Sequence, residues 1–197
     1  MKAKYKLIGI ALLLTLIESV HAQHKVKLDV MSGINYSWVR SKFLQGIEPA
    51  FGFYLGASGT IKAREKLSFS LNYLVSRKGY TQFLDKEYKV QFTYLELQAI
   101  ANYHLLKSVS LYGGSDVSIL ANVNVKKWLR TYNSIDFSLV GGIRFFDKTP
   151  VTFNAQIVYG LIPVLNYYDI DKLGNLTSIK DVKNICLSVG IRYRIIK

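Results

Sequence analysis

The last stretch of the sequence, residues 184–197, alternates between apolar and polar side chains. Its odd positions from 185 to 195 are Ile, Leu, Val, Ile, Tyr and Ile, and its even positions from 184 to 194 are Asn, Cys, Ser, Gly, Arg and Arg. A period of two predicts a β-strand with one apolar and one polar face. About 12 residues at roughly 3.3 Å each, tilted by about 40°, cross the apolar layer of a membrane. Because an unpaired backbone group in lipid costs several kcal/mol, the strand must pair on both edges, and we predict that it closes a transmembrane barrel.

Seven earlier segments alternate in the same way and supply the partners. They are residues 27–38, 50–61, 67–76, 91–105, 109–121, 135–145 and 151–161. The segment 109–121 has the weakest pattern, because Gly113 and Ser115 fall on its otherwise apolar side. The predicted fold is all-β, an eight-stranded antiparallel up-and-down transmembrane β-barrel that forms one domain of residues 23–197.

The connections between these segments alternate in length. The long ones are residues 39–49, 77–90, 122–134 and 162–183, and the short ones are 62–66, 106–108 and 146–150. An even strand number with long loops at one rim and tight turns at the other is the outer-membrane arrangement, with both termini on the periplasmic side. A soluble exported barrel would instead bury its apolar face around a ligand, and eight strands enclose too little space for so many aromatic side chains.

Aromatic side chains also gather near the predicted strand ends, where the boundaries between lipid and water favour them. Tyr36, Trp38, Phe51 and Phe53 lie at the rim of the long loops, and Phe69, Tyr103, Phe145 and Tyr193 at the rim of the turns.

Residues 1–22 have the composition of a signal peptide. Lys2, Lys4 and Lys6 precede an apolar run over residues 7–17, which is too short to span a bilayer as a helix. Cleavage is expected between Ala22 and Gln23, with an uncleaved membrane anchor as the alternative. The exported chain would then carry 23 basic and 12 acidic residues, a net charge of +11. Its single cysteine, Cys186, cannot form an internal disulfide.

Seven charged residues fall on the polar faces of the predicted strands and would lie in the lumen. They are Asp29, Glu96, Asp116, Asp136, Arg144, Arg192 and Arg194. Side chains fill a barrel of eight strands, so this cluster is predicted to be a structural plug and not an open channel. If the turn at 106–108 is tight, Glu96 lies opposite Asp116 and the two carboxylates repel each other. We therefore expect Arg192 or Arg144 to reach them, or one carboxylate to be protonated.

The four long connections contain 12 basic and 6 acidic residues, a net charge of +6. A positive rim would attract the phosphates of lipopolysaccharide and of outer-membrane lipid. The segment with Lys126, Lys127, Trp128 and Arg130 is the best candidate for a lipid or partner contact, although a solvated loop with one packed Trp explains it equally well. No motif supports binding to nucleic acid.

Several short motifs, in their order and spacing, resemble the porin-like family of small Gram-negative outer-membrane β-barrels. They are Gly33 and Asn35 in the first strand, YLEL at 94–97, LYGG at 111–114, the pair Gly141–Gly142, VYGL at 158–161 and SVGIRYRI at 188–195. The resemblance implies insertion by the barrel-assembly machinery. It does not imply a pore, because members are called porins by kinship.

These observations predict a monomeric outer-membrane barrel that acts as a structural, adhesive or partner-binding surface protein, in contact with an envelope protein or with lipid. No metal-ligand spacing, phosphate loop or nucleotide motif occurs, so we expect no catalytic residue, metal or cofactor. Three alternatives stay open: a lipid-modifying enzyme, an accessory barrel of a protein-export machine, and an exported soluble barrel that binds an apolar ligand. His104 argues against the enzyme, because it lies near the turns and not at the outer rim where lipopolysaccharide is modified.

Overall fold

The computed structural model describes residues 26–41, 46–83, 87–106, 108–124, 130–147, 149–170 and 176–196. The predicted signal peptide, its cleavage site between Ala22 and Gln23, and Lys126, Lys127 and Trp128 lie outside these residues.

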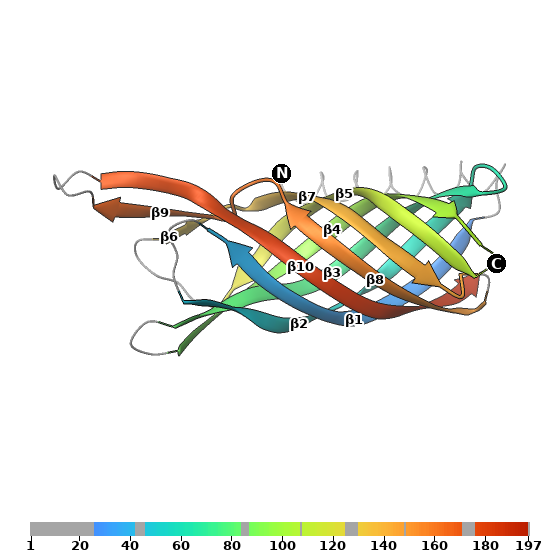
Figure 1. The fold of residues 1–197 in the computed structure, drawn as a ribbon, viewed down its shortest axis with the longest axis horizontal. Coiled ribbons are helices and arrows are strands. Elements are labelled where there is room, and N and C mark those ends of the chain that lie inside the picture. The colour runs from blue at the N-terminus through green and yellow to red at the C-terminus, as the bar shows by residue number, and fades with distance from the viewer. Residues whose placement is uncertain are drawn as a thin grey trace, which may run out of the picture.

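The described chain contains ten β-strands. They are β1 (Lys27–Arg40), β2 (Ile47–Lys62), β3 (Leu67–Phe83), β4 (Glu87–His104), β5 (Val109–Val123), β6 (Arg130–Tyr132), β7 (Ile135–Phe145), β8 (Val151–Gly160), β9 (Leu165–Ile170) and β10 (Leu176–Ile196). All except β6 and β9 form a ring in chain order, in which each strand is antiparallel to the next and β1 pairs with β10 (Figure 1). The predicted eight-stranded up-and-down barrel is confirmed. Within the described part of the chain, no helix is long and apolar enough to cross a membrane.

The apolar rows of the strands point away from the barrel axis. Mid-strand side chains such as Ile34, Leu71 and Val189 are 50–55% exposed, whereas the polar residues that alternate with them are buried. The ring is closed by a continuous ladder in which Gly33 lies opposite Gly190. This inside-out arrangement excludes the soluble-barrel alternative, in which the apolar rows would line the lumen.

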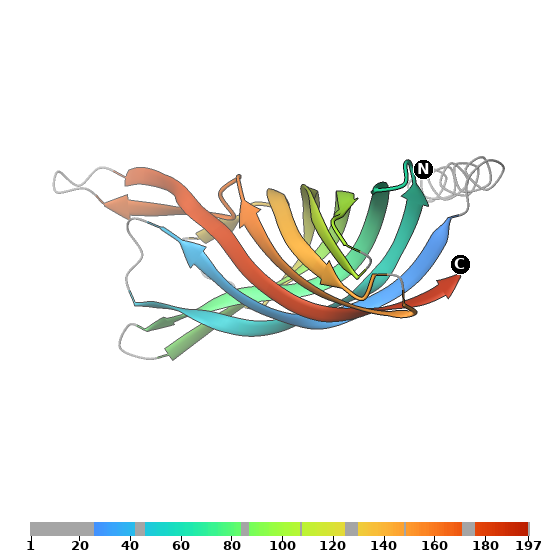
Figure 2. The same ribbon diagram turned by 45° about the vertical axis from the view of Figure 1, so that its right-hand side comes forward.

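Two of the predicted long loops are wrong, because regular strands fill most of them. β3 and β4 stay paired along residues 77–83, up to the pair Phe83 and Glu87, since the alternation continues past the predicted strand end at Ser76. Within residues 162–183, β9 and the first part of β10 form a hairpin, and β6 adds to β9. This hairpin projects beyond the ring, at the end opposite the C-terminus (Figure 2).

The predicted register between β4 and β5 is wrong by two residues. Asp116 lies opposite Gln98, and Glu96 lies opposite Ser118. The cause is a wider connection than predicted: the backbone N–H groups of Leu105 and Leu106 both donate to the carbonyl of Val109.

Candidate functional site in the barrel lumen

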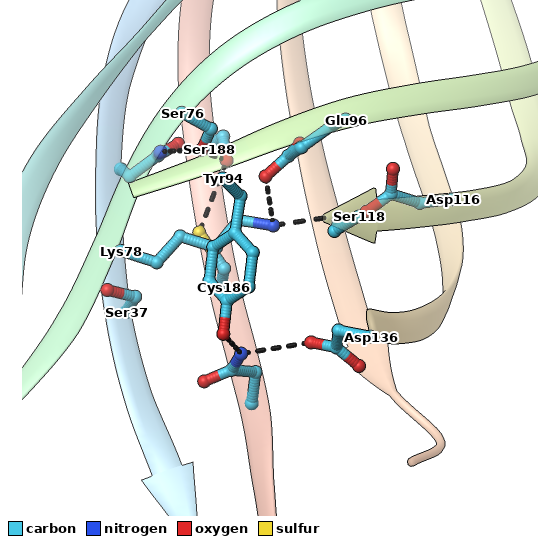
Figure 3. Close-up of polar contacts among 12 residues, drawn as sticks. Ser37, Ser76, Lys78, Tyr94, Glu96, Asp116, Ser118, Asp136, Cys186 and Ser188 are labelled. Atoms are coloured by element: carbon cyan, nitrogen blue, oxygen red, sulfur yellow. Dashed lines mark hydrogen bonds and ion pairs between the residues drawn. The ribbon is translucent and has the colours of Figure 1, made fainter. Parts of the chain in front are cut away.

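A buried lysine organises the second layer of the lumen, counted from its extracellular end. Lys78 Nζ lies 2.6 Å from Glu96 Oε1 and 4.0 Å from Asp116 Oδ2, and all three residues are at most 4% exposed (Figure 3). Glu96 and Asp116 therefore share the lumen as predicted, but the expected bridge from Arg192 or Arg144 is wrong. Lys78 supplies it, from a segment that the sequence analysis assigned to a loop.

Two further polar groups complete this acidic layer. Ser118 donates to Asp116 Oδ2 at 2.8 Å, and Asn184 Nδ2 donates to Asp136 Oδ2 at 3.0 Å. Asn184 Nδ2 also lies 3.2 Å from the hydroxyl of Tyr94 (Figure 3). The layer thus contains three carboxyl groups and one ammonium, an excess of acid.

A mostly neutral hydrogen-bonded layer fills the middle of the lumen. Arg192 donates to Asn72 Oδ1 at 3.3 Å, Asn72 donates to Gln98 at 3.1 Å, and Gln98 lies 3.5 Å from Glu96 Oε2. This chain of contacts connects the acidic layer to the arginines nearer the periplasm.

Tyr54, on β2, fills part of the middle of the lumen. Its hydroxyl accepts a hydrogen bond from Asn154 at 2.9 Å. Its ring crosses the closing seam between β1 and β10, where a Cβ atom at Gly190 would lie 2.1 Å from the Tyr54 hydroxyl. Glycine is required here because the tyrosine occupies the space that any larger side chain would need.

Arginines dominate the layer nearest the periplasm. Asp29 pairs with Arg192 Nη1 at 3.3 Å and with Arg194 Nε at 3.4 Å. The guanidinium of Arg144 lies 4.6 Å from the ring centre of Tyr112. Six of the seven charged residues predicted for the lumen are buried in it, and the seventh, Arg194, is half-buried at the periplasmic mouth. The structure separates them into the acidic layer and this basic layer.

A second polar cluster surrounds the carboxylate of Asp147, in the turn after β7. Asp147 Oδ2 is 2.6 Å from His104 Nδ1 and accepts a hydrogen bond from Ser110 at 2.5 Å. Burial raises the pKa of Asp147, but the hydrogen bond from Ser110 and the electrostatic interactions with His104, Arg144 and Arg194 outweigh burial and hold this pKa below its usual value. His104 Nε2 contacts Ser68 Oγ at 3.3 Å. This order resembles a hydrolase triad, but Ser68 is only 4% exposed.

An apolar cluster closes the extracellular end of the lumen. It contains Val39, Tyr80, Val90, Phe92, Tyr94, Val164, Leu165 and Val182, all at most 3% exposed. Phe92 meets Tyr132 of β6 edge to face, with ring centres 5.4 Å apart. The plug was not predicted, although Phe92 lies on the inward row of the predicted segment 91–105 and Tyr80 lies on the inward row of β3 once that strand is extended.

Neither a metal site nor an exposed thiol is visible in the described residues. They contain no group of three His, Cys, Asp or Glu side chains that could hold a metal ion. Cys186 is buried, with its Sγ 3.5 Å from Ser188 Oγ.

Solved structures of outer-membrane proteins share this architecture. Neisserial surface protein A (NspA) is similar over 84% of this chain and 96% of its own, with a TM-score of 0.51 and 18% identity. This protein has the fold of the small outer-membrane β-barrels. Ail, the attachment invasion locus protein of Yersinia pestis, matches over 87% of this chain and 99% of its own, with a TM-score of 0.48 and 15% identity. OprG from Pseudomonas aeruginosa matches over 88% and 98%, with a TM-score of 0.49 and 13% identity. The sequence matches no protein-family model and no curated protein.

The apolar exterior agrees with the fold, and the barrel belongs in the outer membrane. Its extracellular rim carries outward basic side chains. Arg40 on β1 lies directly opposite Lys183 on β10, and Arg77 lies 5.3 Å from the ring centre of Phe53. Of the predicted loop contact, only the backbone of Arg130 is described, in β6 beside Tyr167.

Proposed function

We propose that this outer-membrane barrel is a non-conducting, non-enzymatic surface protein that acts through its extracellular rim and hairpins. The observation that carries the proposal is the pair of plugs in series: the apolar cluster around Phe92 above, and the Lys78 acidic layer below it. An ion passing the first would have to displace packed aromatic rings, and passing the second would break a buried ion pair. With the lumen filled, the extracellular surface is where this protein can meet a partner.

Single-channel recording tests the closed lumen. The mature protein, refolded into planar bilayers, should give no steady conductance above that of the protein-free bilayer. A variant lacking the plug rings, Tyr80→Ala with Phe92→Ala, tests whether the Lys78 layer closes the lumen by itself. Steady, voltage-independent openings of the wild-type protein would contradict the proposal and indicate a pore.

Contact with lipopolysaccharide is the second part of the proposal. Arg40 and Lys183 occupy directly opposed cross-strand positions, an arrangement that is unfavourable for like charges unless an anion lies between them. Arg40 Nη1 also lies 3.4 Å from the hydroxyl of Tyr159, an outward residue of the neighbouring strand β8. A phosphate at the boundary of the outer leaflet would neutralise both cations.

Binding of purified lipopolysaccharide to the barrel in uncharged micelles tests this contact. The double variant Arg40→Gln with Lys183→Gln should bind about tenfold or more weakly, because two charge-assisted contacts are lost. The control Arg64→Gln removes a positive charge at the opposite rim, outside the cavity that Lys62 and Lys66 line, and should bind as the wild type does. Equal loss in both variants would show that only net charge matters.

The projecting hairpin of β9 and β10 is the proposed partner-binding element. Because Lys78 lies in the lumen, the four connections carry a net charge of +5. Residues 162–183 contain three basic and three acidic residues, so this charge comes from the other three connections and favours anionic partners on the rim around the hairpin. Cells that display the barrel should adhere to surfaces coated with anionic glycans more than to neutral ones. Replacing residues 167–178 by a short turn should abolish adherence and leave the barrel folded. Unchanged adherence would exclude the hairpin as the binding element.

A further inference from the structure

The periplasmic mouth of the barrel contains a cavity of about 460 Å³. Its volume falls within the roughly 300–1,000 Å³ of small-molecule sites. The cavity lies inside the ring, below the arginine layer, and the turns after β2, β4 and β7 form its edge.

The lining of this periplasmic cavity is strongly basic. Its positive side chains are Lys27, Lys62, Lys66, Arg144, Arg192 and Arg194. Only three acids, Asp29, Glu65 and Asp147, line the same space, which leaves a net charge of +3 with His104 neutral. A narrow cavity with low-dielectric walls concentrates such a charge and attracts anions.

Existing contacts engage most of the acid in the cavity. Asp29 is shared by Arg192 and Arg194, and Asp147 by His104 and Ser110. The cavity therefore has more buried cations than carboxylates to pair with them.

Arg144 is the cation left over. It is 3% exposed, its Nε has no hydrogen-bond partner, and its guanidinium lies against the face of the Tyr112 ring, with no carboxylate of the described chain in ion-pair contact with it. Arg192 Nε also has no hydrogen-bond partner. A buried guanidinium with no carboxylate in direct contact is costly, and its five donors match the oxygens of a planar or tetrahedral oxyanion.

We propose that the periplasmic cavity is a binding site for a small molecule bearing a phosphate-type oxyanion, held by Arg144 with Arg192 and approached past Lys27, Lys62 and Lys66. The site opens on the periplasmic side, so it is independent of the surface role proposed above. The bound oxyanion supplies a counter-charge in direct contact with Arg144, and the lysines at the mouth raise the local concentration of anions.

Inorganic phosphate is the probe that tests this site. The full mature barrel is refolded into maltoside micelles, which contain no phosphorus, and phosphate binding is followed by ³¹P line broadening at constant ionic strength with chloride as the balancing anion. Arg144→Gln should weaken binding by about tenfold or more, the loss expected for hydrogen bonds to a charged group. Arg77→Gln, which removes the same charge from the outer surface, should bind as the wild type does.

Two further readouts keep the test decisive. In the wild-type protein, phosphate should shift the backbone amide signals around residues 143–145 and 191–193 and leave those of the β9–β10 hairpin unchanged. Without phosphate, Arg144→Gln should be at least as stable as the wild type, because it removes an unpaired buried charge. No broadening with the wild type, equal binding by Arg144→Gln, or shifts confined to the hairpin would each overturn the proposal.

Discussion

At the scale of single residues, Lys78 sets the charge balance of the acidic layer. Replacing it with Met leaves Glu96 and Asp116 buried without a cation, which should lower the free energy of unfolding by about 3–5 kcal/mol. Adding Glu96→Gln to the same variant should recover part of that loss. Urea unfolding in lipid vesicles measures both effects. The neighbouring outward residue provides the control, since Arg77→Met should change the free energy of unfolding by only about 0.5 kcal/mol. A loss of equal size in Lys78→Met and Arg77→Met would contradict the role of Lys78 as the cation of the acidic layer.

Gly190 gives a second prediction at this scale. An added methyl group would meet the Tyr54 hydroxyl at 2.1 Å and the backbone oxygen of Ser32 at 2.3 Å, so Gly190→Ala should cost about 1–3 kcal/mol through overpacking. At Gly141 nothing lies within 4 Å of the added Cβ atom, so Gly141→Ala should be nearly neutral. The two variants compared in one unfolding series test whether the tyrosine fills the lumen at the seam.

The alternation of side chains was enough to place seven charged residues inside the barrel, because parity, the odd or even position of a residue along its strand, decides which face that residue occupies. It did not identify the partner of Glu96. Lys78 was missed because the predicted strand ended at Ser76, although the inward parity continues through Lys78 and Tyr80. The error in pairing Glu96 with Asp116 has another cause: parity is unchanged by a shift of two residues, so the sequence pattern contains no information on it.

At the scale of elements, the apolar plug joins β3 and β4 to β6, β9 and β10. Phe92→Ala should lower the free energy of unfolding by about 3–5 kcal/mol, because Phe92 is fully buried and its ring packs on those of Tyr80, Tyr94 and Tyr132. Hydrogen exchange should accelerate first in β6 and β9, whose ladders are short. Phe83→Ala, at the exposed end of β3, serves as the control. If the backbone amides of β6 are equally protected from hydrogen exchange in Phe92→Ala and in the wild type, the stability of β6 does not depend on the plug.

The turn after β7 gives a pH-dependent prediction. The pKa of Asp147 is lowered in the folded protein, so its contribution to stability is present above the unfolded pKa of about 4 and is lost as the pH falls through the folded value. The wild type should therefore lose stability below about pH 4 more steeply than Asp147→Asn does. Glu65→Gln, an exposed acid in another turn of the same mouth, is the control. Parallel pH profiles of the wild type and Asp147→Asn would contradict the role given to this cluster.

The sequence predicted where the strands of the ring begin at the periplasmic side, because short turns leave little freedom there. It failed at the extracellular side, where strands extend beyond the membrane and no apolar belt marks their ends. β6 has three residues and depends on pairing with β9, so its formation rests on a tertiary contact that local alternation does not encode.

At the scale of the whole molecule, the arrangement is an inverted globular protein, with ions and amides inside and hydrocarbon outside. The lumen changes from apolar at the extracellular mouth to acidic, neutral and then basic toward the periplasm. This order separates the two activities proposed here, partner binding outside and oxyanion binding at the periplasmic mouth.

The direction of the apolar rows is the central claim, and spin-label accessibility tests it most directly. Single labels at Leu55, Val75, Leu97 and Val189, in a Cys186→Ser background in lipid vesicles, lie on four outward rows. Each should collide often with oxygen, which dissolves in hydrocarbon, and rarely with a water-soluble nickel chelate. Frequent collision with nickel, or protection from both reagents, would place these rows in water or in the lumen and contradict the account.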